Sequence, residues 1–265
     1  MNRIAVLIIS CDNYSDLWST CSKMFDLNWA DCPYDKFILT NNKEYDDNIF
    51  LSLSVGTDLD WSSSLRRALH LLENKGYEYV FTMVEDYFFD QKIVTSDFIK
   101  VADSFTALKG DFLRMHTVIN PRIVEMVNLH FGKVQNNIPY RQTCAFSLWR
   151  IEVLNSLLLD GENAWEFEKV GVRRGFEFEG FYSVSRNSFK TINLVIKGKI
   201  VPSELKKVKK YFPELIFKRP EMSRTQFFRI KIVSNLKLFF LNYLPNWITW
   251  RVYFNVINRK RIGNI

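Results

Sequence analysis

The feature that most constrains the fold of this chain is a series of four short apolar segments, each followed at once by polar residues. The segments are rich in Ile, Val, Leu and Phe, and they cover residues 3–9, 35–42, 49–55 and 77–84. Continuous apolar runs of this length predict strands that are buried on both faces of a sheet. We therefore expect a largely parallel sheet in the first half of the chain.

Helices are predicted between these strands. Leu17, Cys21 and Met24 recur at helical spacing after the first strand. Asp60 is a favourable N-cap for a helix through the residues that follow it, and Gly76 ends that helix. The order strand, helix, strand, strand, helix, strand predicts a doubly wound α/β fold, a central mixed sheet flanked by helices. Ligands of such folds bind beyond the carboxyl ends of the strands, where the polar residues stand here.

The second half of the chain is less regular. Residues 111–118 predict a strand, and residues 191–201 predict a strand that closes the sheet or forms a hairpin. Residues 128–143 are predicted to form a loop. Helices are expected in residues 95–108, in 144–159 after a short strand, and in 160–174 after a turn.

Several classes of site are absent from the sequence. It contains no GxGxxG and no GxxxxGK[ST], so neither a dinucleotide fold nor a P-loop is supported. The four cysteines show no CxxC spacing and the three histidines form no zinc motif. The apolar run near the start is too short for a secretory signal, and no stretch is long enough to predict a spanning helix. We expect a cytoplasmic protein with reduced thiols.

Charge divides the chain into two parts. The formal net charge is +7. Residues 197–265 hold 16 Lys and Arg but 3 Asp and Glu, whereas residues 1–196 carry a net charge of −6. Aromatic residues accompany the basic ones in the tail, a combination typical of a helix lying in an anionic membrane surface. We prefer a membrane to a nucleic acid because the tail shows no nucleic-acid motif, and packing on the body or on a second subunit is the alternative.

Glu85 and Asp86 are the strongest candidates for chemistry. They directly follow the fourth predicted strand, at the edge where ligands of such sheets bind. Carboxylate oxygens suit a magnesium or manganese ion, which would neutralise a diphosphate. An ordinary acidic turn is the competing interpretation.

The surroundings of these acids resemble a known family. The run YVFTMVEDYFF resembles the modified DxD region of GT-A glycosyltransferases, and LIISCDNYSDLW resembles their first strand with its uridine-facing loop. GTDLDWSSSLRRAL is similar to the segment upstream of that region. QTCAFSLWRIEVLNSLLLDGENAWEFE and KGKIVPSELKKV are similar to later segments of bacterial capsule and O-antigen transferases. The resemblance spans about residues 4–210 and implies a GT-A-like fold.

The resemblance also implies a donor site and a metal site. It places a nucleotide sugar, UDP-linked, against residues that follow the strands or begin the second helix: Ser10, Asp12, Asn13, Asn41, Gly56, Asp60, Trp61, Ser62, Glu85 and Asp86. Asp86 would bind a manganese or magnesium ion, with Glu85 assisting. The sequence departs from the full motif because Tyr87 and two phenylalanines follow the acids. Strict metal dependence is therefore not implied.

Inverting transfer needs a carboxylate that accepts the proton of the acceptor hydroxyl. Glu166 and Glu168 are the candidates, and only one can face the site because two helical positions differ by about 200°. The resembling pattern ends on Glu168, which we favour. Acids of a first helical turn also complement the helix dipole, so a structural role competes. We expect Gln142, Trp165 and Arg173 on the acceptor side.

These observations lead to one functional hypothesis and two alternatives. The hypothesis is a glycosyltransferase that moves a sugar from a nucleotide donor to a lipid-linked or growing surface glycan, peripheral on the inner face of the membrane and possible as a homo-oligomer. Residues 1–205 would form the catalytic domain, with a donor half to about residue 110 and an acceptor half from about 111. Residues 206–265 would form a basic amphipathic docking region. The alternatives are a non-catalytic scaffold of glycan assembly and a nucleotidyltransferase.

Overall fold

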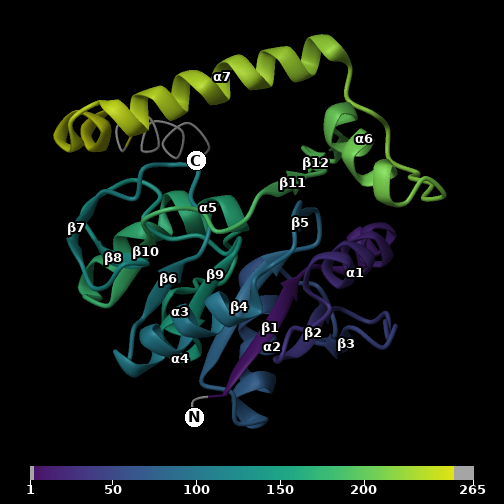
Figure 1. The fold of residues 1–265 in the computed structure, drawn as a ribbon, viewed down its shortest axis with the longest axis horizontal. Helices are drawn as coiled ribbons and strands as arrows, with labels where there is room; N and C mark the ends of the chain where they lie inside the picture. Colours follow the sequence, from purple (N-terminus) through teal and green to yellow (C-terminus); the bar gives the residue numbers. More distant parts are fainter. Residues whose placement is uncertain (1–2, 254–265) are drawn as a thin grey trace.

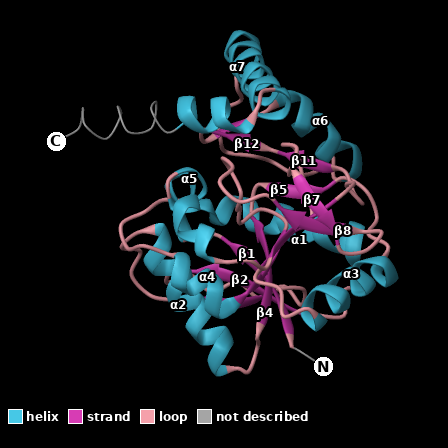
Figure 2. Ribbon diagram, turned by 90° about the vertical axis from the view of Figure 1, so that its left-hand side faces the viewer, coloured by secondary structure: helices cyan, strands magenta, loops and turns pink. Residues whose placement is uncertain are grey.

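The structure of the protein is a computed structural model in which residues 3–253 are described. A nine-stranded mixed sheet in the order β3-β2-β1-β4-β9-β6-β10-β8-β7 forms its centre (Figure 1). Helices cover both faces of this sheet, with α2 and α4 on one side and α1 and α3 on the other (Figure 2). The predicted mixed α/β sheet flanked by helices is therefore confirmed.

The first half of the chain follows the sequence pattern closely. Its four parallel strands are β1 (Ile4–Ile9), β2 (Asp35–Thr40), β3 (Leu51–Ser54) and β4 (Tyr79–Val84). The helices between them are α1 (Ser15–Trp29) and α2 (Trp61–Asn74). Asp60 caps α2 as predicted, accepting a hydrogen bond from the backbone of Ser63, and Gly76 follows the helix with a φ of 82°.

Antiparallel strands continue the sheet in the second half. They are β9 (Ser147–Arg150), β6 (Phe112–Arg114), β10 (Phe181–Val184), β8 (Phe131–Val134) and β7 (Ile123–Met126), of which β6 and β10 are parallel to each other. The helices are α3 (Thr95–Ala107), α4 (Ile151–Leu157) and α5 (Ala164–Lys169), and a 3-10 helix covers Gly171–Glu177.

Three predictions for this half were wrong in detail. The strand expected over 111–118 ends at Arg114. The expected loop 128–143 contains β8, because Phe131–Val134 pairs with the distant strand β10 and Asn128 forms the turn that leads into it. The helix expected over 160–174 is divided at Val170, where α5 gives way to the 3-10 helix.

Two small sheets lie beside the main one. Strand β5 (Tyr87–Phe89) pairs with β11 (Thr191–Asn193), and β12 (Val195–Ile196) pairs with β13 (Lys199–Ile200). The hairpin predicted for residues 191–201 is thus present, whereas this segment does not close the main sheet.

The high aromatic content builds the core. The largest fully buried side chains, Arg141 apart, are all Trp or Phe. Trp29 of α1 packs against Phe98 of α3 with ring centroids 4.5 Å apart, and Phe112 packs against Trp149 at 4.4 Å. Trp149 therefore belongs to the core.

The C-terminal part lies outside this core. Helix α6 (Pro202–Tyr211) leads through residues 212–223 to the 20-residue helix α7 (Arg224–Tyr243). Figure 1 shows α7 running across the end of the molecule opposite the N-terminus. Among residues 3–253, no helix combines the length and the apolar character needed to cross a membrane. The basic residues Arg259, Lys260 and Arg261 of the tail lie outside the described residues.

Candidate functional site

The strands of the first half end at one edge of the sheet. Strands β1 and β4 are parallel, and Ile9 pairs with Val84 at their last residues. The polar residues that follow the strands therefore lie side by side at what we call the carboxyl edge: Ser10 to Asn13 after β1, Asn41 after β2, and Glu85 and Asp86 after β4. The predicted convergence of these residues is present in the structure.

Asp12 joins the loops that follow β1 and β2. Its carboxylate accepts hydrogen bonds from the backbone N–H groups of Asn41 and Asn42, both at 2.9 Å, and of Lys43 at 3.0 Å. The Asn41 side chain accepts from the Asp12 backbone in return. Burial acts to raise the pKa of Asp12, but these hydrogen bonds outweigh it and lower the pKa. Both carboxylate oxygens of Asp12 are thus engaged in holding together the loops that follow β1 and β2.

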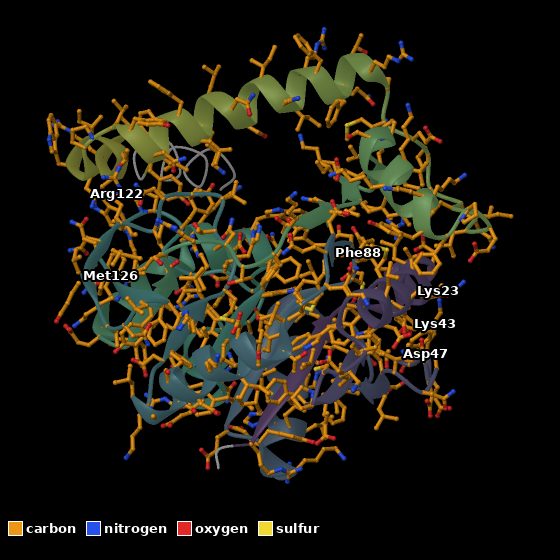
Figure 3. All side chains as sticks on the ribbon, in the orientation of Figure 1. Lys23, Lys43, Asp47, Phe88, Arg122 and Met126 are labelled. Carbon is orange, nitrogen blue, oxygen red and sulfur yellow. The ribbon has the colours of Figure 1, made fainter. Side chains whose placement is uncertain are left out.

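Other residues in and beside the loops that follow β1 and β2 also make hydrogen bonds there, including Ser10, which was predicted to contact the nucleotide sugar. The Ser10 hydroxyl accepts a hydrogen bond from the Trp18 indole at 2.7 Å. Lys43, labelled in Figure 3, donates to the Ser15 hydroxyl at 2.6 Å. The Asn41 amide nitrogen is buried and has no hydrogen-bond partner among the described residues. A buried donor of this kind is costly unless a ligand or water accepts from it.

The N-terminus of α2 connects the two halves of the edge. Asp60 caps the helix, while Ser62 donates from its backbone and hydroxyl to the carbonyl of Glu162. The Trp61 ring lies 5.6 Å from the Phe167 ring of α5. Gly56 has a φ of 76°, which favours glycine, and donates to the carbonyl of Asn41. These residues fix the position of α5 relative to the loops that follow β1 and β2.

Glu85 and Asp86 are adjacent acids at the end of β4, the first buried and the second partly buried. Glu85 is 8% exposed. Burial raises its pKa well above the ordinary range, and the neighbouring Asp86 carboxylate raises it further. Burial also raises the pKa of Asp86, to about 6, against hydrogen bonding from its own backbone and the charge of Arg219. Both carboxyls therefore resist ionisation next to each other, and a bound cation would favour their ionised forms.

Arg219 approaches this pair from the C-terminal part of the chain. Its guanidinium binds the Asp16 carboxylate through two contacts of 2.7 Å, donates to the Asn13 carbonyl at 3.1 Å, and lies 4.2 Å from the centre of the Tyr14 ring. Its positive charge lowers the pKa of both acids. Its side chain is 15% exposed. Arg219 is thus part of the carboxyl edge and not a free cation of the tail.

The acid pair supplies some, but not all, of the ligands that a divalent ion needs. Within residues 3–253, no group of three or more His, Cys, Asp and Glu side chains is arranged to hold a metal. Magnesium and manganese are commonly held by one or two carboxylates, and substrate phosphates and waters complete the shell. Asp86 and Glu85 supply carboxylates of the required type, so the residues fit an ion that arrives with a diphosphate.

The raised pKa values make stability depend on pH. A carboxyl whose pKa is higher in the folded than in the unfolded state binds more protons when folded, so its contribution is lost as pH rises through the folded value. Because burial raises the pKa of Asp86 from 3.8 to about 6, we expect the ligand-free protein, without divalent ions, to lose stability as the pH rises from about 4 to about 6 and to keep this lower stability up to about pH 8. Asp86→Asn should be more stable than wild type at about pH 8, by on the order of 1–3 kcal/mol. Urea denaturation across this pH range measures the free energy of unfolding of both proteins. An equal or lower stability of the variant would show that ionisation of the acid pair does not destabilise the fold.

Glu168 lies on the acceptor side of the same edge. The Thr143 hydroxyl donates to its carboxylate. Thr143 precedes β9, which pairs with β4 through Ser147 and Thr82, so this residue stands at the carboxyl edge. Burial raises the pKa of Glu168, while the Thr143 hydrogen bond and the Arg114 guanidinium lower it. A carboxylate with a raised pKa that lies at this edge has the properties of a general base.

The remaining acceptor-side candidates have different surroundings. The Glu166 carboxylate accepts from the Asn163 backbone at 3.0 Å and closes the capping box of α5. Gln142 is fully buried and donates to the Phe167 carbonyl at 3.1 Å, so it positions α5 from the core. Trp165 is 64% exposed, and Arg173 is exposed on the 3-10 helix. Glu166 and Gln142 therefore hold α5 in place, whereas Trp165 and Arg173 face solvent.

Two residues near Glu168 were missed by sequence reasoning. Arg114, at the end of β6, is 6% exposed, and burial lowers its pKa to about 10. Lys237 of α7 lies with its ammonium 4.0 Å from the centre of the Tyr140 ring. The Lys237 side chain is exposed as a whole, but protein atoms around its ammonium lower its pKa while Glu168 raises it. No local pattern marks either residue, because both reach Glu168 through tertiary contacts.

A hollow of about 730 Å³ lies elsewhere on the molecule. It is lined by Arg3, Asp35 and Tyr77 at the opposite, amino edge of the sheet, together with neighbouring residues. No predicted site residue lines it. We therefore do not assign the candidate chemistry to this hollow.

Comparison with known proteins gives structural similarity only. No family model and no curated protein matches the chain. The structure of S. aureus TarS 1–349 is 12% identical, with 95% of this chain and 80% of that chain covered and a TM-score of 0.49. Its complex with UDP is 12% identical, with 85% and 68% covered and a TM-score of 0.47. A cytidylyltransferase from Leptospira borgpetersenii is 12% identical, with 92% and 99% covered and a TM-score of 0.45. At these values the function has to be inferred from the site itself.

Proposed function

We propose that the chain is a glycosyltransferase that transfers a sugar from a nucleotide donor, UDP-linked, to a lipid-linked or growing surface glycan. The observation that carries this proposal is the acid pair Glu85 and Asp86 at the end of a central parallel strand. Two adjacent carboxyls at this edge, which a cation would help to ionise, suit a cation-bound diphosphate. A scaffold would have no need of such a pair.

The donor is proposed to bind across the ends of β1, β2 and β4. The loop that Asp12 holds together would contact the nucleoside, and the unpaired amide nitrogen of Asn41 offers a donor for a carbonyl oxygen of the base. Arg219 would bind the diphosphate, since it lies beside the acid pair and carries a guanidinium suited to phosphate oxygens. An ion held by Asp86 and Glu85 would add positive charge at the diphosphate.

The proposed reaction is an inverting transfer. The acceptor hydroxyl oxygen forms a bond to the anomeric carbon as the bond from that carbon to the diphosphate breaks. Glu168 accepts the hydroxyl proton, and the nucleoside diphosphate leaves with the bonding electron pair. The hydrogen bond from Thr143 orients the Glu168 carboxylate, and this bond and the charge of Arg114 favour its ionised form against the effect of burial.

The experiment that tests this function is a panel of nucleotide sugars supplied with bacterial membrane lipid and a divalent ion. We expect a nucleoside diphosphate and a glycosylated lipid from at least one UDP-sugar. Release of pyrophosphate from a nucleoside triphosphate and a sugar phosphate would favour a nucleotidyltransferase instead. A panel without product and without nucleotide binding would favour the scaffold.

A further inference from the structure

Helix α7 carries an apolar stripe that faces solvent. Five of its side chains are exposed by 43–75% of their surface: Phe228, Ile232, Leu236, Phe239 and Tyr243. Their spacing of four, four, three and four residues places them on one face, since a helix has about 3.6 residues per turn. Trp247, 69% exposed, follows in the next turn of chain. A continuous exposed stripe of this kind marks an interaction surface.

The helix is held at both ends, and between them Lys237 reaches the Tyr140 ring of the body. Near its start, Lys199 donates to the Gln226 side chain at 3.2 Å. Near its end, Leu241 is buried, and Arg122 donates to the Leu241 and Leu244 carbonyls (Figure 3). Residues 231–237 between these anchors are all exposed. The stripe lies opposite Leu241 by helical periodicity, so the anchors turn it outward.

The charges of α7 are of one sign. It contains Arg224, Arg229, Lys231 and Lys237 and no Asp or Glu. Arg229 and Lys231 flank the stripe next to Phe228 and Ile232. Two copies that met stripe to stripe would bring Arg229 and Lys231 of both copies together without an acid of α7 between them, which opposes dimerisation through this face. An anionic surface with an apolar layer beneath it complements both features.

We propose that α7 docks the protein on an anionic membrane, with the stripe in the boundary between headgroups and acyl chains and with Arg229 and Lys231 among the headgroups. Figures 1 and 2 place α7 beyond the carboxyl edge, so a docked membrane lies on the side of the molecule that holds Asp86 and Glu168. Lys237 connects the helix to the Glu168 surroundings. The membrane then presents the acceptor, a sugar on a lipid anchor; this last step rests on the proposed function.

Flotation of the full chain with vesicles of phosphatidylcholine, with and without phosphatidylglycerol, tests the docking. We expect binding to the anionic vesicles that salt only partly reverses, because the apolar contact is unscreened. Leu236→Ser with Phe239→Ser should reduce the partition coefficient by about tenfold or more, since two apolar side chains no longer enter the interface. Arg229→Gln with Lys231→Gln should reduce it by about tenfold on anionic vesicles only.

A matched control removes exposed apolar side chains elsewhere. Val94 and Leu108, at the two ends of α3, are 59% and 47% exposed, and Val94→Ser with Leu108→Ser should bind vesicles as wild type does. Wild type that fails to float, or a stripe variant that floats like wild type, overturns the proposal. A dimer in light scattering that the stripe variant abolishes, together with absent vesicle binding, would assign the stripe to a second copy.

The same variants separate this inference from the proposed function. Nucleotide-sugar binding by the stripe variant, measured by thermal shift in the absence of vesicles, should equal that of wild type. Failure of docking with intact nucleotide binding overturns the membrane proposal alone. Docking without any nucleotide binding would leave the membrane proposal standing and overturn the transferase.

Discussion

Asp86→Asn should reduce sugar transfer by about 10- to 100-fold or more without lowering the unfolding temperature. The acid lies at the end of β4 among protein atoms that raise its pKa to about 6, so its charge is held there at an energetic cost. An amide removes the charge that would attract a cation and, through that cation, the donor diphosphate. Steady-state rates with the best donor from the nucleotide-sugar panel measure the effect.

The matched control for this substitution is Asp103→Asn, an exposed acid on α3 that faces neither half of the site. It should leave the rate unchanged. Chelation of divalent ions with EDTA tests the metal separately: we expect a loss in wild type that manganese restores, and little further loss in Asp86→Asn. A rate for Asp86→Asn within about twofold of wild type would remove Asp86 from the mechanism.

Glu168→Gln should reduce turnover by at least about a hundredfold while donor affinity stays close to wild type. The amide can still accept the hydrogen bond from Thr143, so the local geometry should persist, but it cannot take a proton. Single-turnover rates with saturating donor, together with donor binding by calorimetry, separate the chemical step from binding.

Glu166→Gln is the control because it makes the same replacement of a carboxylate by an amide, two residues away on the same helix. Its side chain closes the capping box of α5, and a glutamine can do the same, so the cost to turnover should be small. A larger effect at Glu166 than at Glu168 would reassign the base. No effect at either position would mean that the base lies elsewhere or that transfer retains configuration.

Local sequence pattern was sufficient for the first half of the fold. The strands that become β1 to β4, and the helix between Asp60 and Gly76, depend on short apolar runs, a cap and a terminating glycine. Strand β8 was missed because its residues have little strand character by themselves and are fixed by pairing with β10. Such a pairing joins residues far apart in sequence, which local periodicity cannot report.

The candidate site was predictable in position but less so in the role of each side chain. The acids after β4 could be placed at the carboxyl edge from strand order alone. Asp12 holds a loop in place and Gln142 holds α5. Neither role could be predicted, because each depends on the backbone group that the side chain contacts after folding. Arg219 reaches Asp16 across 203 residues, a contact that no spacing rule includes.

Binding of a nucleotide-sugar donor through an ion held by Glu85 and Asp86 is tested most directly by thermal shift with nucleotide sugars. UDP-sugars with manganese should raise the unfolding temperature of wild type, and EDTA or Asp86→Asn should remove most of that rise. The proposal is contradicted if no nucleotide sugar shifts the wild-type transition, or if Asp86→Asn responds to the donor as strongly as wild type does.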